Sequence, residues 1–213
     1  MSRLRLTSAP HYTPPLALVL SFCLLLAAVP ACGYTAVESY FPLADSATWE
    51  YSGKLTGSDG RQLDFHSAIR VEGQTIIRGR KYYKLVTSTD LPAPPGGIKP
   101  SPAVRYYRVA DDGVYALPGS DIGGPELLEM PLPLTAGTKW LSGPTEVKAE
   151  SAGAVSAGGR DYKDCLKITY GAPDGFRSME NYLAPGVGIV KAVHVSTAGP
   201  KFSMEMALDR YRF

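Results

Sequence analysis

Hydrophobic and polar residues alternate along much of this chain after its first forty positions. The clearest runs place apolar residues at Leu63, Phe65, Ile69 and Val71, and at Phe202, Met204, Met206 and Leu208, each separated by polar neighbours. A period of two is the pattern of a β-strand with one buried and one solvent-facing side. Both runs therefore predict half-buried strands.

Further strands are predicted where Tyr, Val, Ile and Thr are concentrated between clusters of Gly, Pro or Asp. These stretches are 81–88, 104–109, 162–170 and 187–195. No long segment with helical periodicity follows the first thirty residues. The expected fold is all-β, an antiparallel barrel, half-barrel or sandwich, formed by a single domain over residues 40–213.

Short motifs recur in the same order in the two halves of this domain. The first match is a Pro-Leu pair before a tryptophan: Pro42-Leu43 before Trp49, and Pro133-Leu134 before Trp140. The second is a Gly-Arg motif that ends in tyrosine: Gly79-Arg80-Lys81-Tyr82 and Gly159-Arg160-Asp161-Tyr162. The third is a tyrosine followed by a glycine and an apolar residue: Tyr107 with Gly113-Val114, and Tyr182 with Gly188-Ile189. The order predicts two related β units, 40–118 and 131–213, which form one domain together. Chance recurrence of common turn and strand residues is the alternative.

Two long connections are predicted between the strands. Segment 91–102 is rich in proline, which cannot donate to a strand ladder and favours an extended, solvated loop. Segment 118–133 contains Gly123-Gly124-Pro125 and then an apolar stretch that can pack on the barrel or form one helical turn. Because loops often carry function, both are candidate contact surfaces, with simple connection as the alternative.

The first residues form an export signal. Arg3 and Arg5 supply a positive start, and the run Leu16–Ala28 is apolar except for Ser21. Such a run suits a secretory signal, and it is shorter than the roughly 20 residues that a transmembrane helix needs. It is followed by Val29-Pro30-Ala31-Cys32.

This ending resembles the lipobox of bacterial lipoproteins, in which the cysteine thiol is acylated before cleavage. The resemblance implies a signal peptide over residues 1–31, lipidation at Cys32 and a short tether over residues 32–39. It also implies a membrane partner through the anchor and, with Gly33 after the cysteine, an outer-membrane location facing the periplasm. Cleavage of the same bond by an ordinary signal peptidase, which gives a soluble secreted protein, is the alternative.

Charge and cysteine usage exclude several functions. The chain has 22 Lys and Arg and 20 Asp and Glu; loss of Arg3 and Arg5 with the signal leaves 20 of each. A neutral chain has no basic footprint for nucleic acid. Only Cys165 remains in the body of the domain, so no internal disulfide is expected if Cys32 is acylated. Cys165, His66 and His194 are too few for an ordinary zinc site, and no cofactor is implied.

Candidate catalytic groups are few, and none is assigned a catalytic role. Ser156 lies in Ala154-Val155-Ser156-Ala157-Gly158, which lacks the first glycine of a nucleophile elbow and its strand-to-helix context. Asp64 and His66 share one strand face and are interpreted as solvated polar residues. The pair Asp111-Asp112 before Gly113 is interpreted as a hairpin turn and not as a calcium loop.

Aromatic residues supply the remaining candidate site. Trp49, Trp140, Tyr83 and Tyr107 are candidates for a ligand-binding or partner-binding surface, because a concave aromatic face suits lipid or sugar. Their simpler role is as large core side chains, each burying on the order of 150–250 Å².

The segments around Tyr40-Phe41-Pro42-Leu43, Pro133–Trp140 and Tyr182–Lys191 are similar to a group of bacterial lipoproteins and secreted β proteins. The resemblance implies an envelope location and a β domain, and it implies no activity. We therefore expect a non-enzymatic envelope lipoprotein that binds an envelope protein or a hydrophobic ligand such as a lipid. An envelope hydrolase using Ser156 or a carboxylate pair, and a structural component of a surface assembly, are the alternatives.

Overall fold

The computed structural model describes residues 40–91, 101–171, 177–197 and 201–213, and all of their strands lie in one compact unit, Tyr34–Phe213. The predicted signal peptide, Cys32 and most of the proline-rich loop lie outside the described residues. The strands are β1 (Thr48–Gly57), β2 (Gln62–Ile77), β3 (Arg80–Thr89), β4 (Ala103–Ala110), β5 (Gly113–Pro118), β6 (Leu127–Pro131), β7 (Lys139–Ser142), β8 (Thr145–Ala157), β9 (Arg160–Gly171), β10 (Arg177–Ala184), β11 (Gly188–Ser196) and β12 (Phe202–Arg212).

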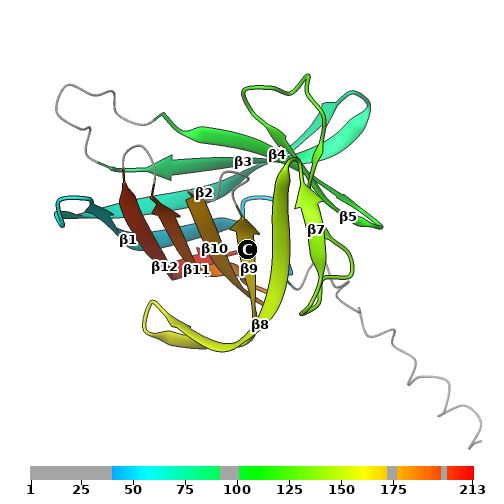
Figure 1. Ribbon diagram of the computed structural model, residues 1–213. Helices are drawn as coiled ribbons and strands as arrows, with labels where there is room; N and C mark the ends of the chain where they lie inside the picture. The colour runs from blue at the N-terminus through cyan, green and yellow to red at the C-terminus, as the bar shows by residue number, and fades with distance from the viewer. Residues whose placement is uncertain (1–39, 92–100, 172–176, 198–200) are drawn as a thin grey trace, which may run out of the picture. The chain divides into compact units, whose positions relative to one another are not determined.

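These strands form one antiparallel sheet in the order β6-β5-β4-β3-β2-β1-β12-β11-β10-β9-β8-β7 (Figure 1). Strands that follow one another in the chain are therefore neighbours in the sheet, except for β6 and β7, which share no ladder. The first strand, β1, pairs with the last, β12. The sheet curls until these two edges approach each other, since Tyr170 on β9 donates a hydrogen bond to Glu129 on β6 (3.2 Å). The result is a nearly closed barrel with one seam, which confirms the all-β antiparallel class.

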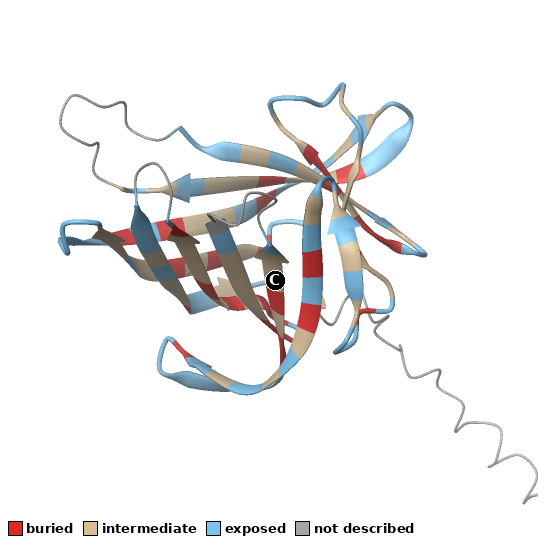
Figure 2. Ribbon diagram, in the orientation of Figure 1, coloured by how far each residue is buried: buried red, intermediate tan, exposed pale blue. Residues whose placement is uncertain are grey.

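One face of the curled sheet carries the buried core (Figure 2). Trp49 and Tyr51 on β1 are almost fully buried. Their polar atoms are satisfied by the backbone at the start of β11, two strands along the sheet: Trp49 Nε1 donates to the Val187 carbonyl (2.7 Å) and the Tyr51 hydroxyl to the Ile189 carbonyl (3.1 Å). Core residues from β4, β8 and β12 join the same cluster. This face is therefore the inside of the barrel.

The N-terminal segment fills one end of this interior. The ring of Phe41 lies 4.9 Å from the ring of Tyr107, and the Tyr40 hydroxyl donates to the Asp164 carbonyl (2.9 Å). The apolar space beside Phe41 and Trp49 amounts to only about 40 Å³. That end, where β1 begins, is a packed core and leaves no room for a ligand; we call it the closed end.

The β8–β9 hairpin covers the closed end. The hairpin bends where Gly153 and Asp164 both adopt positive φ (64° and 53°), and its tip reaches β12. At the tip, Gly158 also has positive φ (55°), and a Cβ there would overlap the carbonyl oxygen of Leu208. Glycine is thus required at this contact by both conformation and space. The bend is visible where the yellow hairpin turns beneath the other strands in Figure 1.

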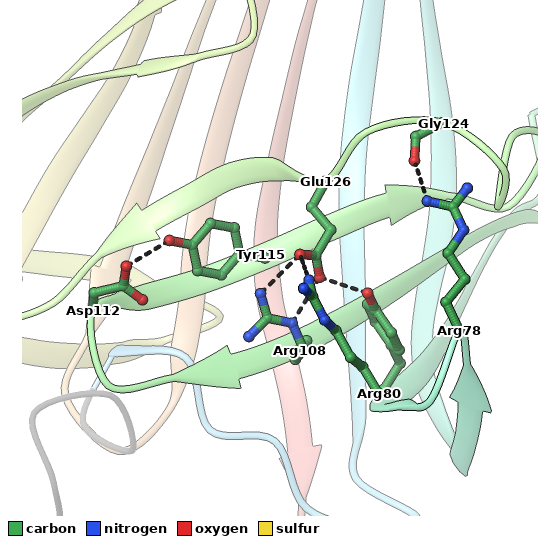
Figure 3. Close-up of polar contacts among 8 residues, drawn as sticks. Arg78, Arg80, Arg108, Asp112, Tyr115, Gly124 and Glu126 are labelled. Atoms are coloured by element: carbon green, nitrogen blue, oxygen red, sulfur yellow. Dashed lines mark hydrogen bonds and ion pairs between the residues drawn. The ribbon is translucent and has the colours of Figure 1, made fainter.

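The connection between β5 and β6 is fastened to the outside of the barrel by Glu126 (Figure 3). Its carboxylate accepts two hydrogen bonds from Arg108 (2.7 and 2.8 Å), one from Arg80 (2.7 Å) and one from the Tyr82 hydroxyl (2.5 Å). The hydrogen bonds from Arg108, helped by Tyr82, outweigh the effect of burial and lower the pKa of Glu126 to about 2. Beneath this clamp, Tyr82 is 2% exposed.

This arrangement corrects the expectation for segment 118–133. Its apolar stretch does pack on the barrel, since Met130 belongs to the core, but it does so as strand β6 (Leu127–Pro131), paired with β5, and not as a helical turn. The hydrogen bonds that favour the strand come from a neighbour in the sheet, so local composition does not reveal them.

The motifs that recur in the sequence lie six strands apart. Trp49 is on β1 and Trp140 on β7; the two Gly-Arg motifs form the β2–β3 and β8–β9 turns; Tyr107 is on β4 and Tyr182 on β10. The environments differ, because β1 is paired on both sides and β7 only on one. The duplication itself stays a prediction.

Candidate functional site

A row of mainly apolar residues crosses the inside of the barrel at the end opposite the closed end. Hydrogen-bond register aligns Leu63, Leu55, Met204, His194, Met179, Tyr170 and Val147, one from each of seven neighbouring strands. We call this set the methionine row. Successive residues of a strand point to opposite faces, so residues in register across a sheet share one face. Val147 and the half-buried Tyr170 belong to the core, which places the whole row inside.

The row next to it, nearer the closed end, is more deeply buried. It consists of Phe65, Gly53, Met206, Ala192, Asn181, Ile168 and Ala149. The ring of Phe65 lies directly over Gly53, so closely that any side chain there would collide with it. Glycine on β1 therefore lets an aromatic ring lie flat against the sheet and form the floor beneath the methionine row.

The opposite face of the same strands is charged. On this outer face, the residues that alternate with the two inner rows along each strand are Asp64, Lys54, Glu205, Val193, Glu180, Thr169, Lys148 and Lys139. Several of these form surface ion pairs, such as Lys54 with Asp64 (2.7 Å). The apolar character of the methionine row is thus confined to the inner face.

The methionine row is only partly covered. Met179, Met204 and Leu55 are half-buried, whereas Leu63 at the end of the row is 45% exposed and Phe202 at the rim is 37% exposed. His194, between two methionines, has its pKa lowered by burial, which favours the neutral imidazole. This end of the barrel therefore presents apolar inner surface to solvent, and we call it the open end.

A polar cluster adjoins the methionine row at the seam. The Tyr170 hydroxyl donates to Glu129 Oε1, and Arg105 on β4 lies 3.8 Å from Glu129 Oε2. Burial, aided by the negative charge of Glu129, raises the pKa of Tyr107 to about 12, so its hydroxyl is neutral beside Arg105. The cluster brings together strands on both sides of the seam.

The four aromatic residues singled out from the sequence all point inward, but they do not form one surface. Trp49 and Tyr107 are core residues, 6% and 7% exposed, and Tyr83 and Trp140 pack against the core from β3 and β7. Trp140 pairs with Val147, and its buried indole nitrogen has no hydrogen-bond partner among the residues that the structure describes. The side chains that line the open end are instead mostly aliphatic.

Sequence reasoning found part of this lining and missed the rest. Met204 was identified by its alternation on β12. Leu55, Met179 and Arg105 were not singled out, because their own strands give no sign that they meet Met204 or each other. The alternation of Met204 and Met206 on β12 was the available signal.

Ser52 and Ser156 each donate a hydroxyl proton to a carboxylate and not to a histidine. Ser52 donates its proton to Asp209 (2.6 Å) while its oxygen lies 3.2 Å from His66 Nδ1, so the hydroxyl proton does not go to the histidine. Ser156, at the tip of the β8–β9 hairpin, donates to Asp161. Three hollows of about 500–540 Å³, beside Trp140, beside His66 and Asp90, and beside Lys54 and Glu205, are open and have linings that mix charged and apolar side chains.

Within the described ranges, no group of three or more His, Cys, Asp or Glu residues could hold a metal ion. Asp111 and Asp112 form the turn between β4 and β5, with Ala110 paired to Gly113, as the sequence predicts. None of the helices among those same residues is long and apolar enough to cross a membrane. Cys165 is a buried free thiol.

The chain matches no known family model and no curated protein sequence. Among solved structures, an exported protein with a YmcC-like fold from Bacteroides fragilis is 12% identical, with a TM-score of 0.49 over 82% of this chain and 99% of that one. A protein described as a lipoprotein from Parabacteroides distasonis is 12% identical, with a TM-score of 0.45 over 82% and 98%. A LolA superfamily protein from Nitrosomonas europaea is 9% identical, with a TM-score of 0.31 over 84% and 90%. These scores are too low to carry an inference about what this chain binds.

Proposed function

We propose that this chain is a non-enzymatic lipoprotein of the bacterial envelope, tethered through Cys32, whose β domain binds a flexible apolar ligand at the open end. The observation that carries the binding proposal is the methionine row, which is partly exposed on the inner face of a barrel whose outer face is charged. Covering exposed apolar surface is favourable by about 25 cal/mol per Å². The open end therefore gains free energy when an apolar molecule lies on it.

The composition of the row favours an unbranched chain as the ligand. Met179 and Met204 have several rotatable bonds and a polarizable sulfur, so they adapt to a ligand that is itself flexible. The floor formed by Phe65 and Gly53 is flat and apolar. An acyl chain fits both properties, whereas a rigid polar sugar would leave its hydroxyls without partners.

Two further observations support the rest of the proposal. The export signal and Cys32 support an envelope location, and a tether raises the effective concentration of the domain near other envelope components. The hydroxyl of Ser52, which donates to Asp209 and not to His66, supports a role without catalysis.

Titration with N-phenyl-1-naphthylamine, a neutral apolar fluorophore, tests the binding proposal. We expect its fluorescence to rise on addition of the purified chain, and Met204→Lys to weaken binding at least tenfold, because the ammonium would be desolvated by the bound probe. Ser203→Lys is the matched control: it is the next residue of β12, it is exposed, it points outward, and it should bind like the unsubstituted chain.

Met179→Lys on β10 provides a second inner variant, so that a folding defect in one variant does not decide the outcome. Thermal unfolding of each variant is measured alongside the titration. Absence of probe binding by the unsubstituted chain, or unchanged binding by both folded inner variants, would refute the proposal.

A further inference from the structure

We infer that the ligand is an anionic amphiphile and that Arg105, at the seam of the barrel, receives its head group. The inference rests on the proposed apolar ligand and adds the chemistry of its polar end. It starts from a permanently charged and exposed group beside the polar cluster that adjoins the methionine row: the Arg105 side chain is 59% exposed.

The ion pair that Arg105 forms with Glu129 is long. The distance of the guanidinium from Glu129 Oε2, 3.8 Å, is too long for a hydrogen bond. Arg108, on the same strand but facing outward, is held by Glu126 at 2.7 and 2.8 Å and is 19% exposed on its side chain. The neutral Tyr107 hydroxyl accepts a hydrogen bond from the guanidinium, and Tyr170 also lies nearby, so part of the donor set of Arg105 is used within the protein. The guanidinium keeps its remaining donors for an incoming anion.

The negative charge of Glu129 does not cancel the attraction of Arg105 for an anion. Its side chain is 16% exposed, and one of its oxygens accepts the hydrogen bond from Tyr170. The charge that a ligand meets first is thus the guanidinium. His194, the other titratable group on the inner face here, is held toward its neutral form by burial.

The methionine row extends toward the Arg105 guanidinium. Tyr170 is the register neighbour of Met179, and its hydroxyl contacts Glu129, which lies beside Arg105. From Leu55 on β1 to Tyr170 on β9 the row spans four strand spacings, about 19 Å at ~4.8 Å each. A long acyl chain extended along the row would place a carboxylate or phosphate at Arg105.

Displacement of bound N-phenyl-1-naphthylamine by matched amphiphiles tests this inference. Laurate, dodecyl phosphate and 1-dodecanol carry the same chain with a carboxylate, a phosphate or a neutral hydroxyl. We expect each anion to displace the probe at a concentration about tenfold or more below that of dodecanol, in line with a charge-assisted hydrogen bond. The two anions compared with each other distinguish a carboxylate from a phosphate head group.

Arg105→Gln should abolish the preference for the anions while leaving the affinity for the probe and for dodecanol unchanged. Arg70→Gln, on the outward-facing side of β2, is the control and should keep the preference. If all three amphiphiles compete equally in the unsubstituted chain, or if Arg105→Gln retains the preference, the inference is wrong although the apolar site stands. If no probe binds, the proposed function fails as well.

Discussion

Replacing Glu126 with Gln removes the carboxylate that fastens the β5–β6 connection to β3 and β4. In the folded chain this carboxylate accepts four hydrogen bonds, and three of them come from Arg80 and Arg108. Glutamine keeps the size of the side chain but has one acceptor oxygen and no charge. The substitution therefore leaves two guanidinium groups with an incomplete set of partners while changing little of the packing.

The expected loss of folding stability in Glu126→Gln follows from the pKa of Glu126. Hydrogen bonds from Arg108 lower it from the ordinary value of 4.5 to about 2. At about 1.36 kcal/mol per unit, this shift corresponds to about 3 kcal/mol of stability at neutral pH. Because Arg80 is 59% exposed and partly screened by solvent, we expect a loss of about 2–3 kcal/mol. For a domain of this size, that loss lowers the melting temperature by about 5–10 °C.

The contribution of Glu126 to folding stability decreases as the pH falls. A carboxyl whose pKa is lower in the folded state stabilises the fold fully above its unfolded pKa, near 4.5, and loses this contribution as the pH falls toward 2. Thermal unfolding followed by circular dichroism at pH 7 and pH 3 measures it. The difference between the unsubstituted chain and Glu126→Gln should shrink by about half or more at pH 3.

Glu72→Gln is the control, because Glu72 has one partner, Lys84 at 2.8 Å, and both side chains are substantially exposed (47% and 37%). A surface pair of this kind contributes at most about 1 kcal/mol. If Glu126→Gln costs no more than Glu72→Gln at pH 7, or if its effect is the same at pH 3, then Glu126 does not clamp the loop as described.

Gly158→Ala should destabilise the domain by about 3 kcal/mol or more, because the new Cβ would overlap the Leu208 carbonyl in addition to straining the backbone. Gly159→Ala is the control, because Gly159 has φ 73° but open space around it, and it should cost about 1 kcal/mol. Urea unfolding measures both variants, and equal midpoints would contradict the packing of the hairpin tip. Mass spectrometry of the mature N-terminus should find an acylated Cys32, and Cys32→Ser should move the protein from the membrane to the soluble fraction; an unmodified N-terminal cysteine would rule out the tether.

Local sequence was sufficient to predict the strands whose two faces differ in polarity. The alternation around Phe65 and Val71 lies in β2, and that around Met204 and Met206 lies in β12. Side chains of successive residues point to opposite faces of any strand, so the pattern is readable without knowing the neighbours. Strand β6 was missed because Leu127–Pro131 is short and owes its conformation to pairing with β5.

The candidate site could not be assembled from the sequence. Leu55, Met204 and Met179 come from three parts of the chain and meet only through the register of β1, β12, β11 and β10. A shift of one residue in any of these pairings would turn a side chain to the charged face. The approach of Tyr170 to Glu129, which brings the methionine row near Arg105, depends further on the curl of the sheet across the seam between β6 and β7.

The sequence by itself determined the all-β class and the positions of six of the twelve described strands, β2, β3, β4, β9, β11 and β12, because alternation and strand-forming residues depend on near neighbours and solvent. It also predicts an export signal and lipidation at Cys32, whose chemistry needs no fold. Only the tertiary structure decided which end of the barrel is filled and which is open, since Phe41 and the tip at Gly158 reach the closed end from distant positions. Long-range register and curvature, which no local pattern encodes, therefore placed the apolar row beside the exposed Arg105.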